Sequence, residues 1–251
     1  YKYREMIVSM VKKELEAKYK GSALGFLWTF INPLLQLIVY TIIFSIIMRA
    51  GIEKFYLFLF VGLMPWTFFS TSVVGGSVSV ISQENLIKKI YFPRQVLPIT
   101  YILAAFVNML LTFIVIFGVL LIDGWGINWG IIWYLPVIML VELLLAMGIG
   151  LLVSALTVYF RDLEHIFGIF MMAWMYMTPI MYTLEMVPEE LRRIIKLNPM
   201  TPVIQAYQDV LYYKQEPQLE TLVQAFTLGI VFLLVGNFVF NKLEPNFVEE
   251  L

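Results

Sequence analysis

Long apolar runs separated by short polar segments dominate the chain. Six runs reach about 20 residues, the length that an α-helix needs to cross a hydrocarbon layer of about 30 Å. They cover approximately residues 25–48, 57–81, 97–122, 133–158, 164–184 and 221–241. The pattern predicts an all-α, polytopic membrane protein with six transmembrane helices, built as a single domain over residues 1–251.

Residues 1–22, before the first run, follow an amphipathic pattern. Apolar side chains recur there at helical spacing, at Tyr3, Met6, Ile7, Met10, Val11 and Leu15. Because lysines occupy much of the remaining surface, we expect an interfacial helix that turns its lysines toward anionic head groups. The first run is too long for a signal-peptide core and lacks a small-residue cleavage site, so we expect no cleavable signal.

The segment between the second and third runs, ENLIKKIYFPRQVLP at residues 84–98, holds more apolar residues than a solvated loop. Glu84 and Asn85 stand where a helix would begin, and Pro93 would end it because the residue before a proline disfavours helical geometry. We expect a short helix that docks in the groove of a partner protein. Its apolar face would consist of Leu86, Ile87, Ile90 and Tyr91, and its basic face of Lys88, Lys89 and Arg94.

Residues 185–220 form a connection long enough to need structure of its own. Pro188 followed by two glutamates is typical of a helix start. Asn198 and Pro199 would end that helix, and Thr201-Pro202 would begin another. We therefore expect two short helices that lie on, or dip into, the outer face of the membrane, as re-entrant or gate helices.

The distribution of basic residues sets the expected orientation. Eleven of the 17 Lys and Arg residues fall on the side of the termini, and six fall on the opposite side. By the positive-inside rule, both termini and the 84–98 segment face the cytoplasm.

Composition excludes several classes of protein. The chain is 61% hydrophobic and 14% charged, far from the balance of a soluble domain. A net charge of −1 argues against nucleic acid as a partner. With no cysteine and a single histidine, His165, we expect no metal site.

The sequence offers no catalytic constellation. It contains no phosphate-binding P-loop, so any ATP that drives it is bound, with magnesium, by another polypeptide. Glu142 is the one carboxylate deep inside a predicted span, and such a residue is a functional hypothesis by default. It has either a structural or pore-facing role, or a role in proton coupling. A membrane enzyme acting on polyprenyl-linked sugars would need a cluster of acids, and no such pair is present.

Two features within the spans concern packing and transport. Gly148, Gly150 and Ser154 in the fourth span would let a neighbouring helix approach closely. Aromatic side chains within spans either contact lipid and other helices or line a pore whose rings stack on sugars. The candidate channel-lining residues are Tyr40, Phe44, Trp66, Phe69, Trp174, Tyr176 and Tyr182, together with Glu142.

Four stretches occur in a fixed order around the six spans. They are ELEAKYKGSALGFLWTFINPLL (residues 14–35), ENLIKKIYFPRQVLP (84–98), YFRDL (159–163) and LNPMTPVIQAYQDVLYY (197–213). With this topology, the chain resembles the permease subunits of type 2 ABC exporters over essentially its whole length. The similar branch exports lipid-linked polysaccharides such as O-antigen, in lipopolysaccharide biosynthesis, and teichoic acid. One departure is Gln208, where the family often has Arg.

The resemblance implies a transport subunit, not an enzyme, in the bacterial inner membrane. It implies a homodimer joined to two cytoplasmic ABC ATPase subunits, with an undecaprenyl-linked glycan passing near the dimer interface. The N-terminal helix and the 84–98 segment would transmit ATP-driven movement. The ATPase-coupling residues would be Glu84, Asn85, Lys88, Lys89, Tyr91, Phe92 and Arg94, and the external gate would include Pro188, Asn198, Pro199 and Asp209. The alternative remains a proton-coupled secondary transporter or channel that uses Glu142.

Overall fold

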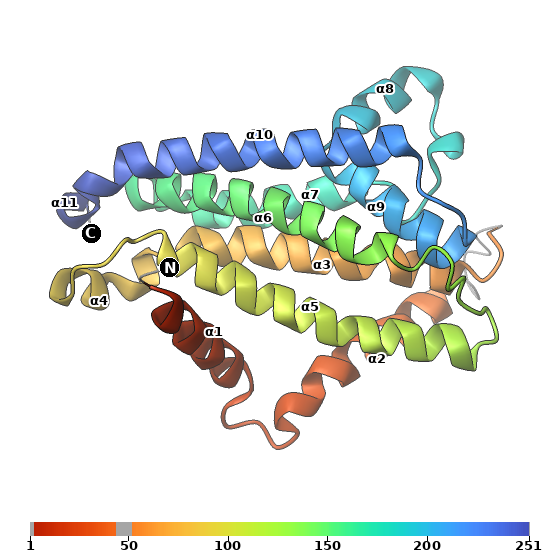
Figure 1. Cartoon of the computed structure of the whole chain (residues 1–251), viewed down its shortest axis with the longest axis horizontal. Helices are drawn as coiled ribbons and strands as arrows, with labels where there is room; N and C mark the ends of the chain where they lie inside the picture. Colours follow the sequence, from red (N-terminus) through yellow and green to blue (C-terminus); the bar gives the residue numbers. More distant parts are fainter. Residues whose placement is uncertain (1–2, 44–51, 251) are drawn as a thin grey trace.

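A computed structural model describes residues 3–43 and 52–250 (Figure 1). Every regular element in these ranges is helical. Five helices there are long and apolar enough to cross a membrane. They are α2 (Trp28–Tyr40, which with its flanking turns covers Gly25–Ile43), α3 (Phe55–Val78), α5 (Val96–Ile122), α6 (Tyr134–Tyr159) and α10 (Leu219–Leu243). The all-α, polytopic fold is confirmed.

The fifth predicted span is shorter than expected. Its helix, α7, covers Leu163–Tyr176, so the predicted segment 164–184 is helical only in its first part. The helix ends just before Thr178 and Pro179, because proline lacks the N–H of the next turn and its ring disfavours helical geometry in the preceding residue. At 14 residues, α7 falls short of the length that a straight span needs.

Helix α3 forms the centre of the bundle. Apolar side chains surround most of it, a pattern that favours burial, while Thr67 and Thr71 are polar exceptions on one side. It contacts α5, α6, α7 and α9 (Met200–Gln208). Phe58, Phe60 and Phe69 on this helix are fully enclosed. By contrast, α2 buries only Thr29 and Pro33 of its described residues, and apolar side chains on its outer face are exposed.

Small residues bring α6 and α10 into close contact, as the sequence predicted for Gly148. A Cβ atom added to Gly236 on α10 would lie 2.0 Å from the carbonyl oxygen of Gly148. An added Cβ at Gly150 would lie 2.5 Å from the Cδ1 atom of Ile102 on α5. Helices α6 and α10, and likewise α6 and α5, therefore approach more closely than larger side chains at these glycines would allow.

The two ends of the bundle carry different elements (Figure 1). At one end lie the start of α1 (Arg4–Tyr19), the short helix α4 (Glu84–Lys89) and the C-terminal turn α11 (Phe247–Glu250). At the other end lies α8 (Glu189–Leu197), which α9 follows directly. The predicted amphipathic helix, the helix of the 84–98 segment and the pair of short helices after α7 are thus all present.

Candidate functional site

The 84–98 segment protrudes at the end of the bundle that carries both termini. A 3₁₀ turn at Ile81–Gln83 leads into α4, whose first turn contains Glu84. Lys88 donates a hydrogen bond to Glu84 Oε1 at 2.6 Å, one helical turn away. This hydrogen bond and the positive charge of Lys88 lower the pKa of Glu84. The pair stabilises a helix too short to persist alone.

The helix ends two residues earlier than its expected apolar face requires. Ile90, three residues before Pro93, is already extended, with φ −133° and ψ 133°. Phe92 turns inward and is buried, whereas the Tyr91 side chain is 95% exposed. The expected face, Leu86, Ile87, Ile90 and Tyr91, is therefore divided: Ile87 is buried in this chain, and Ile90 and Tyr91 face outward.

Ile87 and Phe92 anchor the segment in a second apolar cluster. This cluster also contains Leu151 and Val158 of α6 and Phe240 of α10. Between the anchored helix and the extended residues lies a hollow of about 340 Å³. Its lining includes five of the seven expected coupling residues, Lys88, Lys89, Tyr91, Phe92 and Arg94. Asn85 lies outside this lining and is exposed.

The C-terminal segment holds residues 84–98, the candidate coupling segment, in place, a contact that the sequence did not predict. The backbone N–H of Arg94 donates to Glu244 Oε1 at 2.7 Å, and the Arg94 guanidinium donates to the Glu244 carbonyl oxygen. Phe247 is completely buried beside Phe240, with ring centroids 5.3 Å apart, and beside Tyr159. Arg94 is thus occupied within its own chain.

Three of the expected channel-lining aromatics pack together inside the bundle. The Trp174 ring lies 5.3 Å from Phe69 and 6.2 Å from Trp66, edge to face in both cases. Trp66 and Phe69 are buried, and Trp174 is partly buried. Within one chain these rings serve as core.

The other candidates are dispersed. Tyr40 is partly buried against the core, and Phe44 lies outside the described residues. Tyr176 is 62% exposed, and its carbonyl oxygen accepts a hydrogen bond from the Tyr182 hydroxyl at 3.0 Å. Glu142 has no exposed surface, and its Oε2 atom accepts a hydrogen bond from Tyr207 of α9.

Asn198 organises the end of the bundle that carries α8, where the sequence predicted an external gate. Its side-chain oxygen accepts hydrogen bonds from Trp174 Nε1 at 2.8 Å and from the N–H of Met200 at 2.9 Å. Its amide group donates to the Met177 carbonyl and to the Thr178 hydroxyl. One side chain thus satisfies groups left open at the end of α7 and at the start of α9.

The remaining gate candidates lie at the ends of the outer helices. Pro188 and Pro199 occupy the positions just before α8 and α9. Asp209 begins a π-helical turn, Asp209–Tyr213, and accepts a hydrogen bond from Gln215 at 2.7 Å. Burial raises the pKa of Asp209, against the opposing effect of this hydrogen bond. Gln208, also buried, donates to the Pro179 carbonyl at 3.0 Å and joins α9 to the end of α7.

Comparison with known proteins agrees with this arrangement. The model of the family described as ABC-2 type transporter matches residues 5–212. The O-antigen export system permease protein RfbA of Myxococcus xanthus is 35% identical, over 100% of this chain and 97% of its own length. The protein of the same name from Klebsiella pneumoniae is 34% identical, over 98% of this chain and 95% of its own.

A more distant relative is the polysialic acid transport protein KpsM of Escherichia coli. It is 25% identical to this chain, over 90% of each protein. The family model and the two relatives above 30% identity match most of the chain. The match includes residues 84–98, the central helices, and α8 and α9. This chain belongs to the ABC-2 type transporter family.

Proposed function

We propose that this chain is the membrane-spanning subunit of an ATP-driven exporter that moves a lipid-linked polysaccharide, such as an O-antigen, across the bacterial inner membrane. The observation that carries this proposal is the coupling segment. It presents an exposed aromatic tip, Tyr91, on a base that Ile87 and Phe92 anchor in the bundle. The names of the relatives supply the class of substrate.

The coupling segment is suited to a protein partner that supplies ATP hydrolysis. Tyr91 and Ile90 beside a hollow, with Lys88 and Lys89 at its rim, combine the aromatic anchor and the charged surround typical of binding hot spots. Two ABC ATPases would bind here, one on each copy of the chain. Because the anchoring cluster includes side chains of α6 and α10, a push on the segment reaches both helices.

A passage for the glycan requires a second copy of the chain. The centre of the bundle is filled by α3, so a polysaccharide does not fit through one subunit. The outer faces of α2 and α7 are largely exposed and would face the dimer axis, where their separation opens the channel. The outer pair α8 and α9, fixed by Asn198, would gate the far mouth.

The orientation follows from the same arrangement. Both described ends of the chain lie at the same end of the bundle as α4 (Figure 1), the helix that carries Lys88 and Lys89. By the positive-inside rule this end is cytoplasmic, where an ATPase has access to ATP.

The proposal is tested by expressing the chain with its ATPase partner in cells that make an O-antigen but lack their own permease. Surface display of the glycan and ATP hydrolysis by the purified complex are measured together. We expect both with the intact chain, and neither when the ATPase lacks its catalytic carboxylate. Export that persists without a working ATPase and stops when the proton gradient is collapsed would contradict the proposal.

A further inference from the structure

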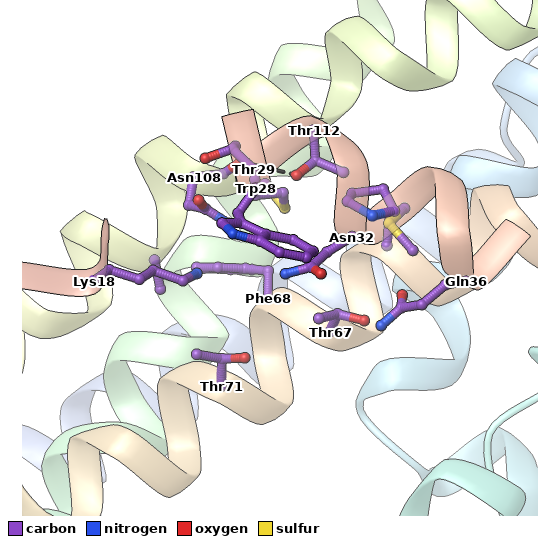
Figure 2. A pocket seen from close by; sticks show the side chains of 14 residues that line it. Lys18, Trp28, Thr29, Asn32, Gln36, Thr67, Phe68, Thr71, Asn108 and Thr112 are labelled. Atoms are coloured by element: carbon purple, nitrogen blue, oxygen red, sulfur yellow. Dashed lines mark hydrogen bonds between the residues drawn. The ribbon is translucent and has the colours of Figure 1, made fainter. Parts of the chain in front are cut away.

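Three membrane-spanning helices carry pairs of polar side chains that line the same crevice. The pairs are Asn32 and Gln36 on α2, Thr67 and Thr71 on α3, and Asn108 and Thr112 on α5. Side chains four residues apart lie on one face of a helix, one turn above the other. Figure 2 shows these pairs around a common space, which measures about 150 Å³.

Some of these polar groups are satisfied within their own helix. The Thr67 hydroxyl donates to the Leu63 carbonyl at 2.8 Å, and the Thr112 hydroxyl donates to the Asn108 carbonyl at 3.0 Å. Their oxygen lone pairs remain available as acceptors. A threonine in this arrangement tolerates an apolar setting but also accepts a hydrogen bond from a ligand.

The amides on α2 differ from these threonines. Asn32 and Gln36 are exposed, and no hydrogen bond joins either side chain to another residue in the described ranges 3–43 and 52–250. An amide within a membrane span costs several kcal/mol if neither protein, water nor ligand satisfies it. Two such amides, one turn apart beside a polar crevice, indicate a polar occupant.

A cation and an aromatic ring complete the lining. Lys18, near the end of α1, extends its side chain toward the crevice, and the Trp28 ring lies beside it (Figure 2). The Trp28 N–H donates to the Ser22 hydroxyl at 2.9 Å, which fixes the orientation of the indole. An ammonium group attracts phosphate, and an indole face receives the C–H face of a sugar ring.

A second hollow of about 370 Å³ adjoins the crevice and reaches the interfacial helix. The two share Lys18, Thr71, Ala105 and Asn108. The second hollow adds Tyr101 of α5 and Glu14 of α1, whose carboxylate is the acidic group in its lining. Its volume lies within the range of about 300–1,000 Å³ that is usual for ligand sites.

We propose that this crevice binds the head of a membrane lipid in which a phosphate ester is joined to a hydroxylated group. Lys18 would bind the phosphate, and the amides of Asn32, Gln36 and Asn108 would bind the hydroxyl groups. The tail would extend from the crevice into the bilayer. If the lipid is the carrier of the exported glycan, the site also serves the proposed function.

The test measures lipid retained by the purified, full-length chain in native mass spectrometry. The probes are a short-chain polyprenyl pyrophosphate sugar, phosphatidylglycerol and phosphatidylcholine. Lys18→Gln and Asn108→Leu are compared with two controls, Lys13→Gln on the exposed side of α1 and Thr227→Val on α10. Thermal unfolding of each variant reports whether the chain still folds. Lys18→Gln is the variant least expected to disturb folding, because Lys18 lies outside the central bundle.

We expect each crevice variant to weaken retention of a phosphate-bearing probe by about tenfold, while both controls retain it as the intact chain does. Loss confined to the polyprenyl sugar identifies the glycan carrier as the ligand, and equal loss of phosphatidylglycerol identifies an ordinary anionic lipid. Unchanged retention of every probe in Lys18→Gln overturns the proposal. Loss of the dimer in that variant also overturns it, because the crevice would then be a contact between copies. The assay needs neither ATPase nor transport, so its failure leaves the proposed function standing.

Discussion

Tyr207 donates a hydrogen bond to Glu142 across 2.7 Å, and neither side chain has any exposed surface. The two residues belong to α9 and α6, so this bond joins the short helix α9 to the central bundle. The second carboxylate oxygen, Glu142 Oε1, has no hydrogen-bond partner among the described residues. A buried acid whose neighbour is a phenol fits the structural role foreseen for Glu142 better than a proton relay does.

Replacing Tyr207 with Phe removes the hydroxyl that donates to Glu142 and leaves the carboxyl group buried without that bond. We expect the free energy of unfolding to fall by about 1–3 kcal/mol. Thermal unfolding in detergent measures the change. The control is Tyr182→Phe, which removes a more exposed hydroxyl bonded to the Tyr176 carbonyl and should change little.

Adding Glu142→Leu to Tyr207→Phe should restore part of the lost stability, because the unpaired polar group is then absent as well.

Export by Glu142→Gln supplies a separate test of the alternative function. The amide still offers an oxygen to Tyr207, so we expect ATP-driven export to continue. Complete loss of export from a stably folded Glu142→Gln protein would favour proton coupling instead.

Replacing Gly236 with Ala should force α6 and α10 apart. The new Cβ would meet the backbone of Gly148, which cannot rotate away as a side chain can. Overpacking of this kind costs about 1–3 kcal/mol, measured as a lower midpoint of thermal unfolding. Gly118→Ala on α5 is the matched control, since no atom lies within 4 Å of its added Cβ. Equal unfolding midpoints for the two variants would show that the helices are not held together at this contact.

Replacing Tyr91 with Ala should weaken binding of the ATPase partner by at least about tenfold without altering the stability of the chain. The reason is that Tyr91 is 95% exposed and contributes little to the bundle. Affinity is measured by titrating the purified ATPase onto the chain in nanodiscs. Trp129→Ala, another exposed aromatic, is the control for nonspecific loss of apolar surface. Undiminished affinity in Tyr91→Ala would exclude this residue as an anchor.

Charge reversals in the coupling segment should separate two roles. Lys89→Glu alters an exposed charge, so we expect lower stimulation of ATP hydrolysis with unchanged thermal stability. Arg94→Glu also breaks the guanidinium bond to the Glu244 carbonyl, so both stimulation and stability should fall. Normal assembly and export by both variants would contradict the coupling assignment.

The end of the bundle that carries Asp123, just after α5, should lose stability in acid. Burial alone would raise the pKa of Asp123, but hydrogen bonds from Lys54, at 2.5 Å, and from Tyr56, with the Lys54 charge, lower it below the ordinary 3.8. A carboxylate with a lowered pKa stabilises the fold above its unfolded pKa, and this contribution disappears as pH falls through the folded pKa. Asp123→Asn should therefore unfold at a lower temperature than the intact chain at pH 7, and the gap should close below about pH 4. Lys54→Gln should shrink the same gap, and a gap independent of pH would refute this account.

The length and hydrophobicity of segments sufficed to predict most of the fold. The five long spans, the amphipathic α1, α4 and the outer pair all follow from periodicity and from proline and helix-start signals. The hydropathy pattern did not predict the early end of α7, although Thr178-Pro179 indicates it. The run of apolar residues continues past this point, and hydropathy does not register a turn that Asn198 and Gln208 stabilise from elsewhere in the sequence.

The direction of individual side chains was less predictable. Because apolar side chains surround most of α3, nothing in its pattern distinguishes a pore-facing Trp66 from one packed against Trp174. Tyr91 and Phe92 are adjacent, yet Tyr91 is exposed and Phe92 is buried, because the direction of each side chain depends on where α4 ends. The contacts of Arg94 with Glu244 join residues 150 positions apart, a relationship that no local pattern encodes.

The clasp between Arg94 and Glu244 has a consequence for biogenesis. Arg94, just before α5, receives its partner from Glu244, just after α10, so the 84–98 segment is held in place only after α10 has been made. A polypeptide still emerging from the ribosome, or one cut after Lys242, lacks both Glu244 and the buried ring of Phe247. If the ATPase docks on this surface as proposed, it should engage finished subunits in preference to unfinished ones.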